Sequence, residues 1–294
     1  MTQAVLLLAH GAPERVEDVA SYLSFVRSGR PGNPQVEEEV RHRYAAIGGA
    51  SPLLRWTRAQ AEALQQLLGV PVYFAMRNWA PFIKDVVPGI HAGRVAAICL
   101  APQFSELSVG LYIKRTEEAA PSLAISWARS YHDEPLLIDA FAERLRPLLP
   151  GKVLFTAHSL PEKALANGDP YDLECRATAA AVAKRVGLTS YDFAYQSQGM
   201  TADRWLGPTV ESFLDEYAAQ GIRDVVIDPI GFVCDHVEVL YDIDIQFRDY
   251  AAARGITVRR PESLNDSPTF TAALAAVVRG TGLLACAGER SSPA

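Results

Sequence analysis

Cysteine is scarce in this sequence. The 294 residues contain four cysteines, Cys99, Cys175, Cys234 and Cys286, and no two of them form a C-x-x-C pair. Such dispersed spacing fits neither a disulfide framework nor a zinc or iron–sulfur site. We therefore expect buried or free thiols, no iron–sulfur cluster and no tightly bound cofactor.

Long apolar runs are also missing. The longest, at residues 4–9 and 95–102, fall far short of the roughly 20 residues that span a bilayer. The chain does not open with a charged start, an apolar core and a small-residue cleavage pattern. We therefore expect a cytoplasmic protein without a transmembrane segment.

Positive charge is not in excess, because 28 lysines and arginines face 34 aspartates and glutamates, a net charge of −6. An acidic chain without a basic stripe argues against a nucleic-acid partner. The chain also lacks G-x-G-x-x-G, a P-loop lysine motif and G-x-S-x-G. These absences argue against dinucleotide, nucleotide and serine-hydrolase chemistry.

What the sequence does contain is a regular alternation of apolar strands and amphipathic helices. The expected strands are residues 4–9, 70–75, 95–100, 191–195 and 225–227, and the expected helices are residues 14–27, 53–68, 81–90, 175–186 and 210–220. Continuous apolar runs predict strands buried on both faces, as in a parallel sheet covered by helices.

The second half of the chain repeats the first. Residues 5–14 align without gaps on residues 153–162, and six of the ten positions are identical, as the pairs V-L, A-H and P-E. We predict an α/β fold of two similar Rossmann-like domains, residues 1–147 and 148–294, whose parallel sheets face a shared cleft. The last helix is expected to be able to pack back on the first domain.

A cluster of ionisable side chains follows the expected strand at residues 225–227. Asp235, His236, Glu238, Asp242 and Asp244 lie there among apolar residues. In open α/β sheets, ligands bind just beyond the carboxyl ends of the strands. If the segment is helical, Glu238 and Asp242 lie one turn apart on one face. The cluster indicates a cation or proton-transfer site, and the alternative is a solvated acidic helix start.

His10 and His158 occupy the same position in the two repeats, each at the end of an expected buried strand. Together with Glu238, they are expected to reach the shared cleft. An imidazole there can bind iron or accept a proton near neutral pH. The alternative for a loop histidine is hydrogen-bonded scaffolding.

Arg27, Arg30 and Arg43 concentrate positive charge in the first half of an acidic protein, near Tyr44 and Ser51. Guanidinium groups suit carboxylates, which they bind as forks. The alternatives are solvated surface cations and, for Ser51, a helix cap.

Five segments of the chain resemble those of ferrochelatases, the enzymes that insert ferrous iron into porphyrins: IGGASPL, APQFSELSVGLYIKR, AHSLPEK, YQSQGMTADRWLGP and GFVCDHVEVLYDID. They occur in the family's order, within a resemblance that runs from Ala4 to about Val278. It is closest to the soluble bacterial, coproporphyrin-using type. The resemblance implies a type II chelatase-like fold, in which two Rossmann-like halves clasp a porphyrin, in agreement with the duplication.

By position, the resemblance assigns His158 and Glu238 as the pair that binds iron and transfers protons. It assigns porphyrin contacts to His10, Arg27, Arg43, Tyr44, Ser51 and Tyr112. The partners that it implies are a porphyrin and ferrous iron, both as substrates.

The chain departs from the family's patterns at three places. Many coproporphyrin-using members ligate the product's iron through a tyrosine where this chain has His10, so we expect nitrogen ligation here. The outer metal site of some members uses an Arg, an Asp and a Glu. Arg43 and Asp242 match it, but Gln246 replaces the glutamate, which predicts a weak site. The C-terminal cysteine cluster of the iron–sulfur members is absent, and Cys286 stands alone.

The sequence therefore predicts a ferrochelatase of haem biosynthesis that favours coproporphyrin III over protoporphyrin IX, because three arginines exceed what two propionates need. One alternative is a cobalt chelatase acting on sirohydrochlorin, which the A-H-G segment at residues 9–11 also resembles. Another is a non-catalytic haem or porphyrin carrier. The polar loop at residues 28–35 lacks the apolar lip of membrane-bound members, so we expect a soluble monomer.

Overall fold

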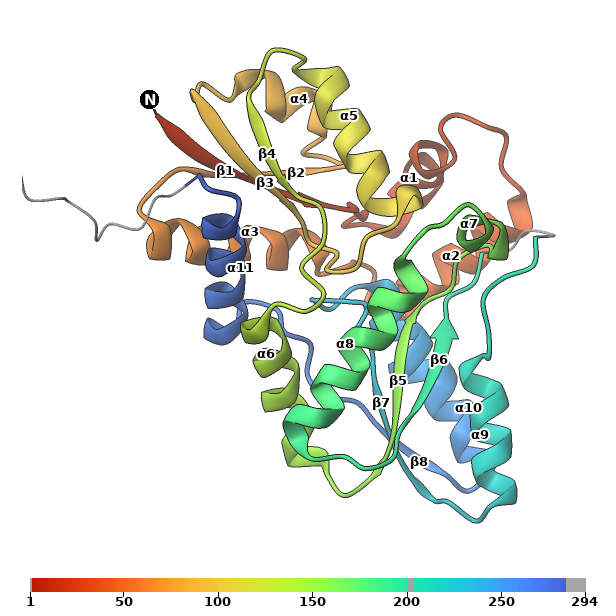
Figure 1. The fold of residues 1–294 in the computed structure, drawn as a ribbon. Helices are drawn as coiled ribbons and strands as arrows, with labels where there is room; N and C mark the ends of the chain where they lie inside the picture. Colours follow the sequence, from red (N-terminus) through yellow and green to blue (C-terminus); the bar gives the residue numbers. More distant parts are fainter. Residues whose placement is uncertain (1, 200–202, 284–294) are drawn as a thin grey trace, which may run out of the picture.

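The computed structural model describes residues 2–199 and 203–283 of the chain. Two α/β halves lie one above the other in Figure 1, each built on a four-stranded parallel sheet. The strand orders are β2-β1-β3-β4 and β6-β5-β7-β8, so each strand of the second sheet has its counterpart in the first. These two sheets with flanking helices confirm the predicted fold class.

The first half runs from β1 to the short helix η4. Its elements are β1 Gln3–Ala9, η1 Val16–Asp18, α1 Val19–Val26, α2 Pro34–Ala46, α3 Leu53–Leu68, β2 Val72–Met76, α4 Ile83–Val86, η2 Val87–Gly89, β3 Arg94–Cys99, η3 Glu106–Gly110, α5 Leu111–Ala119, β4 Ile125–Ala128, α6 Pro135–Leu145 and η4 Arg146–Leu148. Of the η segments, η1, η2 and η4 are 3-10 turns and η3 is a π-helix.

The second half repeats this order without the α1–α2 insertion. Its elements are β5 Lys152–His158, α7 Glu162–Ala166, α8 Tyr171–Val186, β6 Asp192–Gln196, α9 Val210–Ala219, β7 Asp224–Asp228, η5 Glu238–Phe247, α10 Arg248–Ala252, β8 Thr257–Arg259 and α11 Pro268–Gly280. A π-helix, η5, again follows the third strand of the half, as η3 does in the first.

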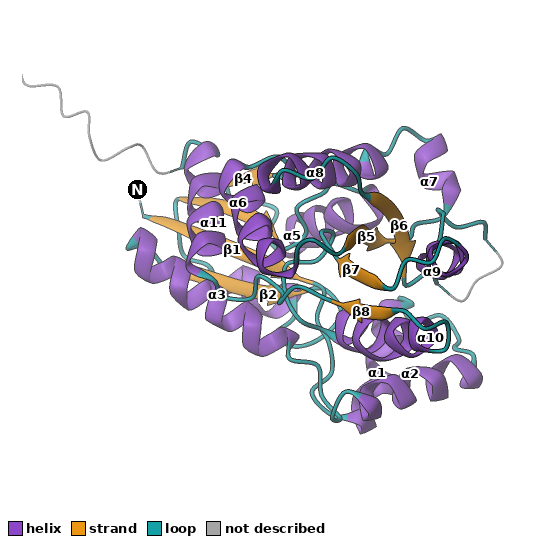
Figure 2. Cartoon of the chain, turned by 90° about the horizontal axis from the view of Figure 1, so that it is seen from below, coloured by secondary structure: helices purple, strands orange, loops and turns teal. Residues whose placement is uncertain are grey.

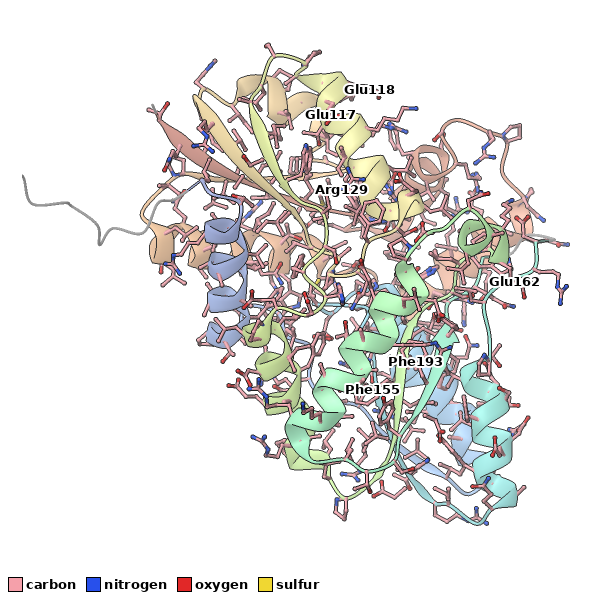
Figure 3. The ribbon with its side chains drawn as sticks, viewed as in Figure 1. Glu117, Glu118, Arg129, Phe155, Glu162 and Phe193 are labelled. Atoms are coloured by element: carbon pink, nitrogen blue, oxygen red, sulfur yellow. The ribbon has the colours of Figure 1, made fainter. Side chains whose placement is uncertain are left out.

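Burial on both faces explains why β1 and β5 form the centres of their sheets. Residues 4–9 are all buried, and so are residues 153–157. Phe155 on β5 lies opposite Phe193 on the neighbouring strand β6, and both rings, labelled in Figure 3, belong to the largest core cluster. Burial of one such side chain contributes about 1.5–3 kcal/mol, so the central strands tie each half together.

The last helix of each half packs against the other half. Helix α6 follows β4 of the first sheet but contacts α8, whereas α11 follows β8 of the second sheet and contacts α3 (Figure 1). Helices α6 and α11 also contact each other, and one cluster of buried residues joins both halves. The division at residue 147 stays a prediction, because the two halves share this core.

The helices and strands differ from the sequence prediction where a proline interrupts a helix or where a strand is very short. The helix expected at residues 81–90 is limited to α4 and the turn η2, because Pro88 has no N–H to continue the helix. The helix expected from residue 14 starts at Val16, since Arg15 has extended backbone. Strands β4 and β8 were not predicted; they have four and three residues, too few to show periodicity.

The segment after Asp235 is helical, as expected, but η5 is a π-helix. Its buried apolar residues Val239, Ile243 and Phe247 recur at every fourth position, which fits a turn wider than the 3.6 residues of an α-helix. Within residues 2–199 and 203–283, no helix is long and apolar enough to cross a membrane.

Candidate active site

A cavity of about 260 Å³ lies between the two halves, at the carboxyl ends of β1 and β5. Six of the residues singled out from the sequence line it: His10, Tyr44, Tyr112, His158, His236 and Glu238. The α1–α2 insertion contributes Tyr22 and Tyr44 to the wall, and Figure 2 shows that it reaches from the first half to the α10 side of the second. The duplicated strand ends therefore meet at one cleft.

His158 is the last residue of β5 and faces the cleft with one ring nitrogen. Its Nδ1 is 2.5 Å from the carbonyl oxygen of Ser159, to which it donates its hydrogen. This bond occupies Nδ1 and leaves Nε2 available for the cleft, where it lies 3.5 Å from Oε1 of Glu238. The backbone thus sets which nitrogen of His158 can react.

Glu238 begins η5 and lies between two histidines. Its second oxygen, Oε2, is 3.7 Å from Nε2 of His236. His236 resembles His158 in its anchoring, because its Nδ1 is 3.0 Å from the carbonyl oxygen of Cys234. The side chain of Gln196, at the end of β6, donates to the Glu238 carbonyl at 3.2 Å and holds the start of η5 at the second sheet.

Charge pairing decides the protonation states of the two partners. Burial by itself would lower the pKa of His158, but the Glu238 carboxylate and the Ser159 carbonyl raise it to about 9. Burial would raise the pKa of Glu238, yet His158 and His236 hold it well below its usual value. At neutral pH the pair is an imidazolium beside a carboxylate.

Asp242 lies on η5 four residues after Glu238, but it is buried against other partners. Oδ1 is 3.1 Å from Nη1 of Arg43, and the Ser197 hydroxyl donates to Oδ2. Burial and the charge of Glu238 raise the pKa of Asp242 to about 6. Gln246 is exposed on the same helix. The outer metal site of Arg43, Asp242 and Gln246 stays a prediction. In the structure, the guanidinium of Arg43 is bound to the carboxylate of Asp242.

His10 follows β1 and differs from His158 in its neighbours. Nη2 of Arg77 lies 3.3 Å from its Nδ1, and Nδ2 of Asn78 lies 3.1 Å from its Nε2. Burial and the positive charge of Arg77 lower the pKa of His10 to about 3. His10 is therefore a neutral imidazole, and both its ring nitrogens lie beside side chains that follow β2.

Two of the tyrosines that line the cleft carry neutral hydroxyls. Tyr44 is fully buried, and its hydroxyl has no hydrogen-bond partner in the described part of the chain. The ring of Tyr112 lies under the guanidinium of Arg77, 4.7 Å from ring centre to Cζ. Burial raises the pKa of both phenols, so both remain protonated.

Ser51, Arg27 and Arg43 are not among the residues that line the cavity. The Ser51 hydroxyl accepts from the Leu53 N–H at 3.4 Å, while Pro52 is the N-cap residue of α3. Arg27 caps the end of α1, and its buried Nε has no acceptor in the described chain. Arg43 binds Glu39 as well as Asp242, so both its partners are protein carboxylates.

Sequence reasoning missed Arg77, Asn78 and Tyr22. The first two directly follow β2, which ends at Met76, so the rule that strand ends carry ligands could have found them. Tyr22 lies in the middle of α1, and nothing in the sequence distinguishes it from a core residue. The three described cysteines, Cys99, Cys175 and Cys234, are buried and free, while Cys286 lies outside the described residues.

Solved structures with this fold include a sirohydrochlorin chelatase. The sirohydrochlorin chelatase SirB from Bacillus subtilis subspecies spizizenii, in complex with cobalt, matches with a TM-score of 0.60 and 13% identity, over 96% of this chain and 95% of that one. CbiX, described as the terminal enzyme for biosynthesis of siroheme in denitrifying bacteria, matches with a TM-score of 0.51 and 15% identity, over 94% and 98% of the two chains. The fold is that of a type II chelatase.

Comparison with known sequences then specifies the family. The ferrochelatase family model matches residues 2–281. A ferrochelatase of Acidobacterium capsulatum is 48% identical over 92% of both chains. A coproporphyrin III ferrochelatase of Bacillus pumilus is 35% identical over 93% of this chain and 95% of that protein. The chain belongs to the ferrochelatase family, the porphyrin-metallating enzymes of haem biosynthesis, and this confirms the resemblance found in the sequence.

Proposed function

We propose that this enzyme inserts ferrous iron into coproporphyrin III, with His158 and Glu238 as the groups that receive the iron and the pyrrole protons. The observation that carries this proposal is the pair itself, an imidazole and a carboxylate 3.5 Å apart in the cleft between the halves. A proton acceptor and a metal ligand are what the reaction requires at one place.

Insertion exchanges two pyrrole protons for one ferrous ion, so two protons must leave the macrocycle. His158 carries a proton at rest, because its pKa is raised to about 9, and it must lose that proton before Nε2 can bind iron. Glu238 is ionised at rest, so it is able to attract the cation and to accept one pyrrole proton. His158 releases its own proton to solvent before iron binds, and its Nε2 accepts the second pyrrole proton once the iron has passed to the macrocycle.

The two walls of the cleft differ in charge. Glu238 places a carboxylate on the second half, and Arg77 places a guanidinium on the first half, beside His10. A ferrous ion is attracted to the wall that carries Glu238 and repelled by the wall that carries Arg77. This asymmetry supports iron binding at the His158 side of the porphyrin plane.

Uncompensated arginines near α1 support coproporphyrin III as the substrate. Arg43 is occupied by carboxylates, but Arg27 and Arg30 form no ion pair in the described chain. Arg115 on α5, which sequence reasoning passed over, is also without a carboxylate partner there and reaches the Ser28 hydroxyl at 3.5 Å. Three free guanidinium groups beside one loop favour a substrate with many propionates. The names of relatives such as the Bacillus pumilus protein agree.

Neither alternative from the sequence is favoured. The sirohydrochlorin chelatases share the fold at 13–15% identity, whereas the ferrochelatases share 35–48% of their residues with this chain. A non-catalytic carrier would need no group to accept protons, but the cleft places Glu238 between two histidines.

Substrate choice is tested by anaerobic insertion of ferrous iron into coproporphyrin III and protoporphyrin IX. We expect a higher kcat/KM for coproporphyrin III, and Arg27→Leu should lower that value about 10-fold or more while changing protoporphyrin IX less. Arg41→Leu is the matched control, because Arg41 is bound to Glu37 at 2.8 Å on the outer part of α2. A higher kcat/KM of the wild type for protoporphyrin IX would overturn the proposed substrate.

A further inference from the structure

Arg260 is a buried arginine that holds two separate parts of the second half. It directly follows β8, and its side chain is 11% exposed. Its guanidinium binds Asp244 as a fork, with Nε 2.9 Å from Oδ1 and Nη2 2.7 Å from Oδ2. The remaining nitrogen, Nη1, donates to the Pro261 carbonyl at 3.0 Å and the Ser263 hydroxyl at 3.2 Å, and lies 3.3 Å from Oδ1 of Asp235.

The two carboxylates bound by Arg260 flank the candidate catalytic residues. Asp235 lies three residues before Glu238, and Asp244 lies six residues after it, on η5. His236 is the neighbour of Asp235. One guanidinium therefore ties both sides of the segment that carries Glu238 and His236 to the end of β8.

The loop after β8 fixes Asp235 from two further directions. The Ser263 hydroxyl donates to Oδ1 at 2.7 Å, and Nδ2 of Asn265 donates to Oδ2 at 3.0 Å. Oδ1 of Asn265 accepts from the Asp235 N–H at 2.9 Å. The N–H and both carboxylate oxygens of Asp235 are thus bound to protein, which leaves little freedom for the turn that precedes η5.

We propose that Arg260 is a positioning residue for iron insertion, one that holds Glu238 and His236 at their distances from His158. Arg260 does not line the cavity and touches none of the three. Its effect comes through the placement of η5, and a shift of about 1 Å in a reacting group can cost 100-fold in rate. The inference rests on the proposed role of Glu238.

The neighbouring residue offers a matched control. Arg259 forms the same kind of fork, with Nε 2.9 Å from Oδ1 and Nη2 2.6 Å from Oδ2 of Asp224. Asp224 is the first residue of β7, at the opposite end of the strand from the cleft. Loss of the Arg259 fork therefore removes similar bonds without touching the support of η5.

The test compares Arg260→Lys with Arg259→Lys, because lysine keeps the charge but cannot form the fork. We expect Arg260→Lys to lower kcat about 10–100-fold, as loss of outer support at a metal site does, with porphyrin affinity by fluorescence quenching unchanged within twofold. Arg259→Lys should leave kcat and porphyrin affinity unchanged. A folded Arg260→Lys with wild-type kcat would refute the proposal, and so would an equal loss of kcat in both variants.

A second variant covers the case in which Arg260→Lys does not fold. Asp244→Asn weakens the same fork from the other side, and it should give the same loss of kcat with unchanged porphyrin affinity. Wild-type kcat in folded Asp244→Asn would then refute the proposal. Glu238→Gln distinguishes a failure of the role proposed for Glu238 from a failure of the positioning role proposed for Arg260. If Glu238→Gln keeps its activity, the role of Glu238 fails, whereas normal Arg260→Lys beside an inactive Glu238→Gln refutes only the positioning role.

Discussion

His10 and His158 are the same residue at the same place in two copies of one motif, but their chemistry is opposite. The pKa of His10 is lowered to about 3 and that of His158 is raised to about 9. The strands are equivalent, so the difference comes from the side chains opposite each ring. Arg77 and Asn78 face His10, whereas Glu238 faces His158. Duplication supplied two histidines, and their neighbours gave them different roles.

A second pair of equivalent positions also differs between the halves. Ile98 on β3 lies opposite Leu7 of β1, and Asp228 on β7 lies opposite Phe155 of β5. Both positions are buried. The second half therefore has a carboxyl group in its core where the first half has a methyl-bearing side chain. Oδ2 of Asp228 has no hydrogen-bond partner in the described chain.

The largest effect should come from replacing the two histidines separately. We expect His158→Ala to lower the rate of iron insertion by about 1,000-fold or more, because it removes both the iron ligand and the partner of Glu238. The variant should still fold, since the side chain of His158 is 30% exposed and does not belong to the core. Insertion is measured anaerobically by the absorption of the product.

His10→Ala is the matched variant, and its loss of rate should be much smaller. The sequence predicts that His10 ligates the iron of the bound product, although Asn78 must then release its Nε2. The absorption spectrum of the ferric product complex should change in His10→Ala. Identical spectra for the wild type and His10→Ala would exclude ligation by His10. An equal loss of rate in His10→Ala and His158→Ala would show that the two histidines do not differ in their importance for insertion.

Glu238→Gln should bring the two histidines closer in pKa. Glutamine keeps the shape of Glu238 but has no charge, so the largest cause that raises the pKa of His158 is lost and that pKa should fall from about 9, although the Ser159 carbonyl and Asp242 still oppose the effect of burial. Titration of the histidine ring signals by NMR measures this directly. The rate of insertion should fall about 100-fold while porphyrin binding survives. A His158 midpoint that stays near 9 would show that Glu238 is not the cause.

The last comparison concerns stability rather than rate, at the pair Ile98 and Asp228. Burial raises the pKa of Asp228 to about 7, so the folded state binds its proton more tightly than the unfolded state. Stability should therefore fall as pH rises from about 4 to 7, by up to roughly 4 kcal/mol for this group. Asp228→Asn removes this dependence. The free energy of unfolding is measured with urea at pH 5 and pH 8. Relative to the wild type, Asp228→Asn should be more stable at pH 8 than at pH 5. The same difference in free energy at both pH values would contradict the expectation.

Much of the site was predictable because it lies in continuous stretches of sequence. The apolar runs of β1 and β5 predicted buried strands, and the repeat around His10 and His158 predicted two similar halves. The order of a parallel sheet then places both strand ends at one cleft. Glu238 was found by its charge in an apolar setting, close behind a strand.

Other features depended on contacts that no local pattern records. Arg43 and Asp242 are 199 residues apart in the chain, and their pairing is what removes Arg43 from the set of free cations. The packing of α6 on α8 and of α11 on α3 likewise joins elements distant in sequence.

The sequence by itself determined the longer strands, the duplication, the family and the histidine–carboxylate pair, because each depends on residue types in short, regular stretches. Only the tertiary structure decided which histidine is charged, which arginines are free and what supports η5. A pKa depends on the few ångströms around a group, and those neighbours come from other strands. Arg77 beside His10 and Arg260 between Asp235 and Asp244 are arrangements that the folded chain alone creates.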